Sequence, residues 1–229
     1  MVTGETPREL YYKAYVDTYI EKDVRKLISA SREMRFRKFI ALAALRTGQE
    51  INYAELASEV GVDVDTVKRW LSILETSGII IFLEPYMSNL SKRIIKAPKM
   101  YFMDTGLCAY LCKWPNARML EDCAMSGAFF ETYVISEIAK SFYNHAQNPK
   151  MYLYYYRDID KKEVDLLYAD NDKIYPIEIK KGSAPSKATR NFSALSKYQK
   201  EIMPGLIICN TDKIRPYDEK AYLLPVGMI

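Results

Sequence analysis

Residues 163–181 read EVDLLYADNDKIYPIEIKK, and their pattern predicts a β-hairpin. Apolar and polar residues alternate on both sides of a turn at 169–173, where Asp and Asn accept tight backbone bends. Side chains on a strand repeat every second residue. The pattern places Glu163, Asp165 and Leu167 opposite Val164 and Leu166 in the first arm, and Tyr175, Ile177 and Ile179 opposite Glu178 and Lys180 in the second.

Three polar side chains of this hairpin, Asp165, Glu178 and Lys180, are expected to meet at one rim. Asp165 lies thirteen residues before Glu178, on the preceding strand. Two carboxylates supply the hard oxygen ligands that Mg²⁺ or Mn²⁺ prefers. Such a metal activates a bound water and offsets charge on a scissile phosphate, and the lysine can orient that water. The alternative interpretation is a surface ion pair, which Glu-x-Lys alone commonly forms on a strand.

The same residues carry a resemblance. Asp165 followed by the motif Glu178-Ile179-Lys180 resembles the core of the PD-(D/E)XK nuclease superfamily, although Val164 stands where that family commonly has proline. A helix predicted at 127–142 contains Glu131, which matches the superfamily's upstream helical acid; its alternative role is to favour the helix dipole. The resemblance implies Mg²⁺ or Mn²⁺ as cofactor, Asp165 and Glu178 as metal ligands, and Asp165, Glu178, Lys180 and Glu131 as catalytic residues.

A second resemblance covers most of the chain. The blocks that carry it, in order, are YVDTYIEKDVRKL (15–27), YFMDTGL (101–107), GAFFETYVISEI (127–138), YYYRDIDKKEVDLLY (154–168) and PIEIKKG (176–182). Together they resemble the C-terminal half of a prokaryotic family of AAA-type P-loop ATPases, a half usually described as a domain of unknown function. The resemblance implies an ATPase module as partner, with 1–33 as a helical linker to it. The sequence contains no G-x-x-x-x-G-K-[ST] motif, so ATP hydrolysis is not assigned to this chain.

The sequence predicts an α/β fold with two units. The first, 34–114, reads as a helical winged helix-turn-helix domain, and the second, 115–229, as a restriction-endonuclease-like domain with a mixed sheet. The first unit is expected to contain helices at 34–46 and 53–60, a third helix capped by Asp63 or Asp65 and closed by Gly78, and wing strands at 79–83 and 93–97. The second is expected to contain strands at 150–157, 205–210 and 222–225, and a basic amphipathic helix at 186–200.

Charge is distributed unevenly, although the net charge is only +4. The segment 180–200 carries six basic residues and no acid, which is typical of a phosphate-binding rim but also of a solvated helix face. The third helix of the first unit exposes acids as well as bases, which favours a structural or protein-docking role over reading DNA. Nucleic acid, with DNA the expected kind, is predicted to contact Lys181, Lys187, Arg190, Lys197, Lys96 and Lys99.

Composition and apolar runs indicate which class of protein this is. Hydrophobic residues make up 49% of the 229 residues, enough for a folded core. No apolar run approaches the roughly 20 residues of a membrane helix, and no signal peptide is recognised, so a cytoplasmic protein without a membrane partner is expected. The four cysteines show no disulfide spacing. Cys108 and Cys112 could share a helix face, but a zinc site needs further ligands and the chain has one histidine.

Two functions of different classes follow from these patterns. The first is an Mg²⁺-dependent phosphodiesterase, a nuclease, that acts through the hairpin site. The second is a non-catalytic DNA- or protein-binding module of the ATPase, in which the same residues are a relic. A transcriptional regulator that acts through the winged helix is a third and weaker possibility.

Overall fold

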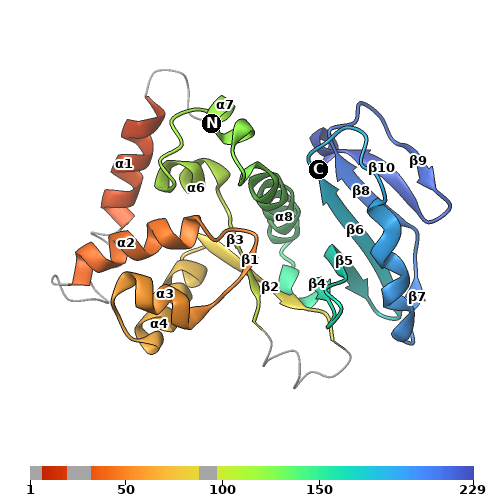
Figure 1. Cartoon of the computed structure of the whole chain (residues 1–229), viewed down its shortest axis with the longest axis horizontal. Helices are drawn as coiled ribbons and strands as arrows, with labels where there is room; N and C mark the ends of the chain where they lie inside the picture. Colours follow the sequence, from red (N-terminus) through yellow and green to blue (C-terminus); the bar gives the residue numbers. More distant parts are fainter. Residues whose placement is uncertain (1–6, 20–31, 88–96) are drawn as a thin grey trace.

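The computed structural model describes residues 7–19, 32–87 and 97–229, and it shows an α/β fold around a mixed sheet (Figure 1). The ten-stranded sheet has the order β1-β3-β2-β4-β5-β6-β8-β10-β9, and β7 pairs with β6 off this path. The strands are β1 (Gln49–Glu50), β2 (Ile80–Pro85), β3 (Lys99–Phe102), β4 (Leu153–Arg157), β5 (Glu163–Asp170), β6 (Lys173–Lys180), β7 (Glu201–Ile202), β8 (Gly205–Cys209), β9 (Arg215–Asp218) and β10 (Ala221–Pro225). The predicted α/β class with a mixed sheet is confirmed.

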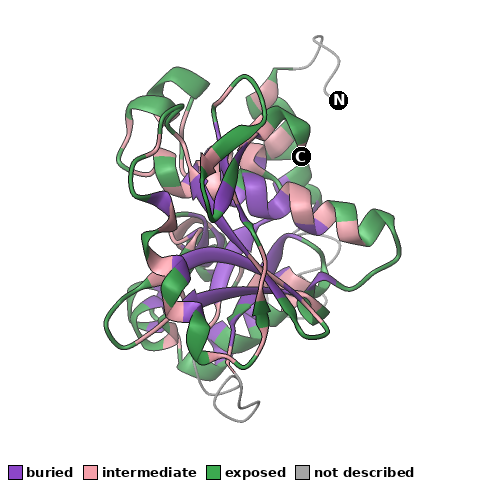
Figure 2. Cartoon of the chain, turned by 90° about the vertical axis from the view of Figure 1, so that its right-hand side faces the viewer, coloured by how far each residue is buried: buried purple, intermediate pink, exposed green. Residues whose placement is uncertain are grey.

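Helices form much of the first half of the chain. In the second half, α8 (Ser126–Asn144) packs on one face of the sheet. The other helices are α1 (Arg8–Tyr19), α2 (Glu33–Ala44), α3 (Tyr53–Val60), α4 (Val64–Thr76), α6 (Thr105–Leu111) and α7 (Ala117–Asp122). Short 3-10 helices are η3 (Pro149–Met151), η4 (Ala188–Lys197) and η5 (Val226–Met228). Figure 2 shows that the buried residues follow the central strands, while exposed residues cover the outer helices and loops.

Local signals place the boundaries of α3 and α4. The side chain of Asn52 accepts a hydrogen bond from the Glu55 amide, and that of Asp63 accepts one from the Thr66 amide, so each residue caps a helix. Gly78, just past α4, has a φ of 70°, the left-handed conformation that favours glycine. The predicted helix at 53–60 and the cap at Asp63 are therefore confirmed. The helix predicted at 34–46 ends earlier, at Ala44, and Leu45 is 40% exposed.

The predicted wing differs from the observed strands. β2 pairs antiparallel with β3, so the second strand is Lys99–Phe102 rather than the predicted 93–97. Residues 93–96 lie outside the described residues. Every residue of β3 is buried, which explains the later position: the apolar run of Met100, Tyr101 and Phe102 enters the core. Asp104 then caps α6 through the Leu107 amide.

One pair of strands joins the two halves of the chain. β2 and β4 run parallel, with Glu84 opposite Tyr154. One face of the joined sheet packs against α8, and the core there draws Leu83 and Tyr101 from the first half and Val134 from the second. The predicted division between 34–114 and 115–229 therefore crosses a continuous sheet and a shared core.

The predicted hairpin is β5 and β6, joined by a tighter turn than expected. Asn171, in the left-handed region with a φ of 50°, makes this turn with Asp172. The predicted faces of β5 are partly wrong. Val164 and Leu167 both pack on the η4 side, and Leu166 packs on the α8 side. A β-bulge in β5 is the reason, because it breaks the alternation of side chains.

The basic helix predicted at 186–200 is a shorter 3-10 helix, η4, which begins after Lys187 in the left-handed conformation. Phe192 and Leu195 are both buried against the sheet. A 3-10 helix has three residues per turn, so side chains three apart lie on one face. The amphipathic pattern was therefore interpreted correctly, and the helix type was not.

Gly205 begins β8 in a close contact that no side chain fits. A Cβ atom at this position would lie 2.5 Å from a Phe192 ring carbon and 2.6 Å from the Pro176 carbonyl oxygen. We expect Gly205→Ala to lower the free energy of unfolding by about 1–3 kcal/mol, because a packed backbone must shift. Urea denaturation checks this against Gly227→Ala, where a Cβ would meet nothing within 4 Å. Equal stabilities of the two variants would contradict the expectation.

Two further expectations concern membranes and thiols. Within the described ranges, no helix combines the length and apolar character that crossing a membrane requires. The four cysteines are all free thiols, as expected from their spacing.

Candidate active site

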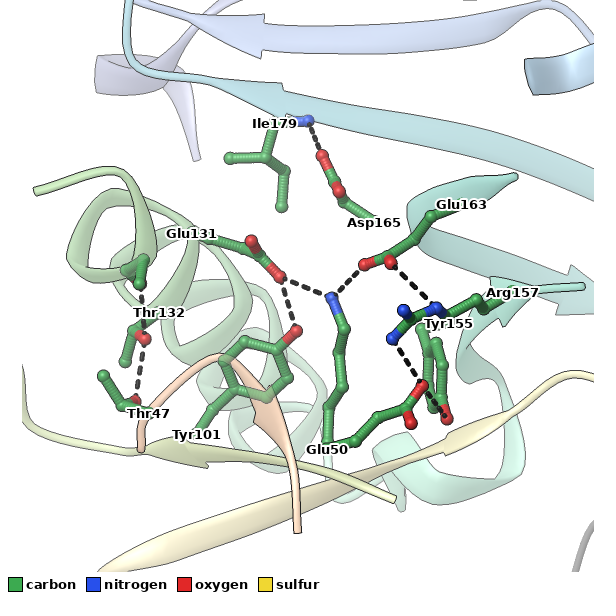
Figure 3. Close-up of polar contacts among 12 residues, drawn as sticks. Thr47, Glu50, Tyr101, Glu131, Thr132, Tyr155, Arg157, Glu163, Asp165 and Ile179 are labelled. Carbon is green, nitrogen blue, oxygen red and sulfur yellow. Dashed lines mark hydrogen bonds and ion pairs between the residues drawn. The ribbon is translucent and has the colours of Figure 1, made fainter. Parts of the chain in front are cut away.

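A β-bulge positions the first predicted site residue, Asp165. Tyr154 pairs with Leu167 and Tyr156 with Val164, so Asp165 and its neighbour together stand opposite a single β4 residue. The bulge turns the Asp165 side chain toward β6, where its Oδ2 accepts a hydrogen bond of 2.8 Å from the Ile179 amide (Figure 3). Asp165 is therefore held near the beginning of β5, next to the carboxyl end of β6.

Glu178 and Lys180, in the last three residues of β6, extend toward the side chain of Asp165. Lys180 Nζ lies 2.7 Å from Glu178 Oε1 and 3.2 Å from Asp165 Oδ2. Glu178 is only 6% exposed, and its second oxygen, Oε2, is buried without a hydrogen-bond partner among the described residues. A buried carboxylate oxygen without a donor is costly, so this atom is suited to a cation. The structure thus brings the three hairpin residues together.

Glu131 reaches the same cluster from α8 (Figure 3). Its Oε1 accepts a hydrogen bond of 2.6 Å from the Tyr101 hydroxyl and lies 3.2 Å from Lys99 Nζ. Burial raises the pKa of Glu131, and the negative charge of Asp165 raises it further. We call Asp165, Glu178, Lys180 and Glu131 the carboxylate–lysine site.

A network of ion pairs continues from this site across the sheet. Lys99 Nζ also lies 2.5 Å from Glu163 Oε1 on β5. Arg157 lies 3.7 Å from Glu163 and 3.1 Å from Glu50 on β1. We call Glu131, Tyr101, Lys99, Glu163, Arg157 and Glu50 the bridging network, because three of its members come from each half of the chain.

Lys99 was predicted to contact nucleic acid at the surface, and the structure corrects this. The residue is 4% exposed, and its ammonium is enclosed by Glu131 and Glu163. A lysine in that position cannot neutralise phosphates of a bound strand. Sequence reasoning also missed Tyr101 and Glu163 as neighbours of the site. The one available signal was a charged residue, Lys99, at the head of an apolar strand, which indicates a buried partner.

The remaining predicted basic contacts have mixed surroundings. Lys187, Arg190 and Lys197 are exposed, and Lys197 lies 4.8 Å from the centre of the Tyr156 ring. Lys181 is half-buried, and its Nζ donates to the Glu121 carbonyl at 2.8 Å. Lys96 lies outside the described residues. The exposed bases therefore belong to η4 and the segment just before it.

Burial and like charge act on the carboxyl groups of the site. Burial, together with the charge of Asp165, raises the pKa of Glu178 to about 7, although Lys180 opposes this. Burial also raises the pKa of Glu131 above its usual value against the opposing charge of Lys99. For the Lys180 ammonium, burial acts to lower the pKa, but the charges of Asp165 and Glu178 outweigh it and raise the pKa. Carboxyl groups crowded in this way gain from a nearby cation.

The oxygen atoms at the site are of the kind that binds a divalent cation, but their spacing matches a metal site less well. Oxygen ligands from Asp165 and Glu178 suit Mg²⁺ or Mn²⁺, and the unpartnered Glu178 oxygen offers a free ligand atom. Within 7–19, 32–87 and 97–229, however, no three His, Cys, Asp or Glu side chains are close enough together to form a metal cluster. In the described structure the Lys180 ammonium lies between the two carboxylates.

An open cavity of about 340 Å³ is lined by residues of α8 and by the residue that follows β6. Its wall includes Phe130, which precedes Glu131 on α8, and Lys181, which follows Lys180 on β6. Tyr133 on the same helix is 40% exposed and also lines the cavity. The cavity therefore has aromatic and basic side chains in its wall that are close in sequence to Glu131 and Lys180.

Comparisons with known proteins divide the chain in two. Residues 2–118 match a family described as a domain of unknown function, DUF8612. Residues 126–229 match another, DUF4143, a domain found at the C-termini of AAA-ATPase proteins. Uncharacterized proteins of Mycobacterium bovis and Mycobacterium tuberculosis are each 32% identical over 185 residues, covering 81% of this chain. The chain spans 41% of the length of these curated relatives. No solved structure matches it.

Proposed function

The chain belongs to the family described as domain of unknown function DUF8612, and we propose that its carboxylate–lysine site is that of a divalent-cation-dependent phosphodiesterase acting on nucleic acid. The observation that carries the proposal is the buried, unpartnered Oε2 of Glu178 beside Asp165 and Lys180. In this proposal 115–229 is a PD-(D/E)XK-like unit. In the same proposal, α2, α3 and α4 form a winged helix with the β2–β3 pair.

Each residue of the site has a role in the proposal. Asp165 and Glu178 would bind Mg²⁺ or Mn²⁺, which when bound offsets phosphate charge and lowers the pKa of a coordinated water. Lys180 orients the attacking water, because its ammonium already lies within hydrogen-bond distance of both carboxylates. Glu131 adds negative charge from α8. The exposed bases Lys187, Arg190 and Lys197 neutralise phosphates of the bound strand, DNA in the first instance.

The longer relatives add a partner to the proposal. DUF4143 is found at the C-termini of AAA-ATPase proteins, and the chain spans 41% of the relatives' length. We therefore include an ATPase module as the partner of this chain, acting in the cytoplasm on the same nucleic acid.

Calorimetry and cleavage together test the proposed function. The full chain is titrated with Mg²⁺ and Mn²⁺, and labelled single- and double-stranded DNA and RNA are assayed with each cation and with EDTA. We expect binding and cation-dependent cleavage, and both should fall by at least about tenfold in Asp165→Asn, since even indirect partners of metal ligands contribute that much. Asp172→Asn, in the exposed turn of the same hairpin, is the matched control. A wild-type chain that neither binds a cation nor cleaves would reject the phosphodiesterase.

A second candidate function is a binding module without catalysis. It is favoured by one observation: Lys180 pairs with both hairpin carboxylates, and Lys99 pairs with Glu131, so the charges are largely compensated by the protein itself. On α4, Asp65, Lys68 and Arg69 are exposed and mix both signs, which suits a protein partner as well as DNA. Binding of labelled DNA in EDTA by fluorescence anisotropy, without cleavage when Mg²⁺ is added, would identify this function.

A further inference from the structure

The bridging network places residues of the first matched region inside the site of the second. Tyr101 and Lys99 lie on β3, within 2–118, while Glu131 lies on α8, within 126–229. Figure 3 shows the Tyr101 hydroxyl directed at the Glu131 carboxylate. The contact joins residues thirty positions apart in the chain, across the break between the two family matches.

Both β3 residues act on one oxygen of Glu131. Tyr101 donates to Oε1 at 2.6 Å, and Lys99 donates to the same atom at 3.2 Å. These two contacts use Oε1, and they fix the plane of the carboxylate. A donor at a buried carboxylate sets its orientation as well as its charge. Both donors of β3 therefore converge on one oxygen of the Glu131 carboxylate.

A purely structural role explains these contacts less well. Tyr101 is fully buried, and a phenylalanine would fill the same space without a polar atom. The buried Lys99 ammonium, held between the partly buried carboxylates of Glu131 and Glu163, costs desolvation energy that an apolar residue would avoid. Costly polar groups that converge on a candidate site are typical of residues that orient a functional group.

We propose that Tyr101 and Lys99 are positioning residues of the phosphodiesterase site, so that the site is complete only when the first region is packed against the second. The inference depends on the proposed function and adds to it. Tyr101 and Lys99 orient Glu131, and Lys99 also anchors Glu163 at the beginning of β5, two residues before Asp165. The first region thus supplies part of the site in addition to any partner surface.

Cation affinity and cleavage of the full chain test the inference with an isosteric variant. Tyr101→Phe removes only the hydroxyl. We expect it to weaken Mn²⁺ binding in calorimetry, measured without nucleic acid, by about tenfold, the lower end of the effect of a ligand's partner, because Tyr101 acts through Glu131. The Mg²⁺ dependence of cleavage should shift to higher concentration by a similar factor. Tyr156→Phe is the matched control, because Tyr156 is also buried and its hydroxyl donates to Asp158 at 3.0 Å, away from Glu131.

Lysine variants provide a second, independent arm. Lys99→Met should lose cation-dependent cleavage. Lys99→Arg, which keeps the positive charge, should retain part of it. If Lys99→Met does not fold, Tyr101→Phe still decides the question. Tyr101→Phe equal to Tyr156→Phe in an active wild-type background would overturn the inference and leave the proposed function standing. A wild type without cation binding or cleavage would overturn both.

Discussion

Lys180→Ala should reduce nucleic-acid cleavage by about 10³-fold or more while leaving the fold intact. The expected size follows from the role: a group that orients or polarises the attacking water contributes about 10²–10⁴-fold. Lys180 is in addition the group that compensates Asp165 and Glu178, at 3.2 Å and 2.7 Å. Removing it leaves two carboxylates unpaired, so the variant loses the orientation of the water and gains repulsion toward phosphate.

Single-turnover cleavage at saturating Mg²⁺ measures this loss, with circular dichroism to check the fold. Lys173→Ala is the matched control, because Lys173 begins the same strand β6, is exposed, and pairs with Glu201 at 3.9 Å. Cleavage by Lys180→Ala within a few fold of Lys173→Ala would remove Lys180 from the mechanism. Loss in Lys180→Ala alone would locate the chemistry at the carboxyl end of β6.

Glu178→Gln should make the cation-free protein more stable than the wild type at pH 8, and this advantage should disappear toward pH 4. Burial and the charge of Asp165 raise the pKa of Glu178 to about 7 in the folded protein, above the ordinary value of 4.5. The folded state therefore binds this proton more tightly than the unfolded state does. Its contribution to stability is fully present below about pH 4.5 and is lost as the pH rises through about 7.

The shift in pKa sets the size of this effect. One pKa unit corresponds to about 1.36 kcal/mol, so the free energy of unfolding of the wild type should fall by up to about 3 kcal/mol relative to Glu178→Gln between pH 4 and pH 8. Urea denaturation in EDTA at a series of pH values measures it. Glu201→Gln, at an exposed carboxylate, should track the wild type. Parallel curves for Glu178→Gln and the wild type would show that Glu178 is not desolvated.

Local elements of the fold were predictable from short-range chemistry. The helix at 53–60 was recognised from its apolar spacing, and the end of α4 from Gly78, two residues past the helix, which adopts a left-handed backbone. The hairpin was recognised because alternation and turn residues agree, and Asp165, Glu178 and Lys180 do meet at its rim. These features depend on residues close in sequence, so their physics is visible in the sequence itself.

The features that were missed depend on contacts between distant residues. No local pattern marks the bulge at Asp165, which arises from the register of β5 against β4. Lys99 resembles a surface base until β3 packs beside α8 and Glu131 encloses it. Glu163 and Tyr101 were not connected with the site for the same reason. The sequence therefore indicated which groups could act, but not which residues orient them.

The parallel pair of β2 and β4 has a consequence for dividing the chain. A cut between 118 and 126, where the family matches separate, would leave β2 as an open edge in one fragment and β4 in the other. Both strands are largely buried and apolar, and the charges and the proline that could blunt such edges stand only at their ends, Glu84 and Pro85 in β2 and Arg157 in β4. Each fragment would present unpaired backbone groups as a template for intermolecular β-pairing. In the intact chain, each half protects the other from aggregation.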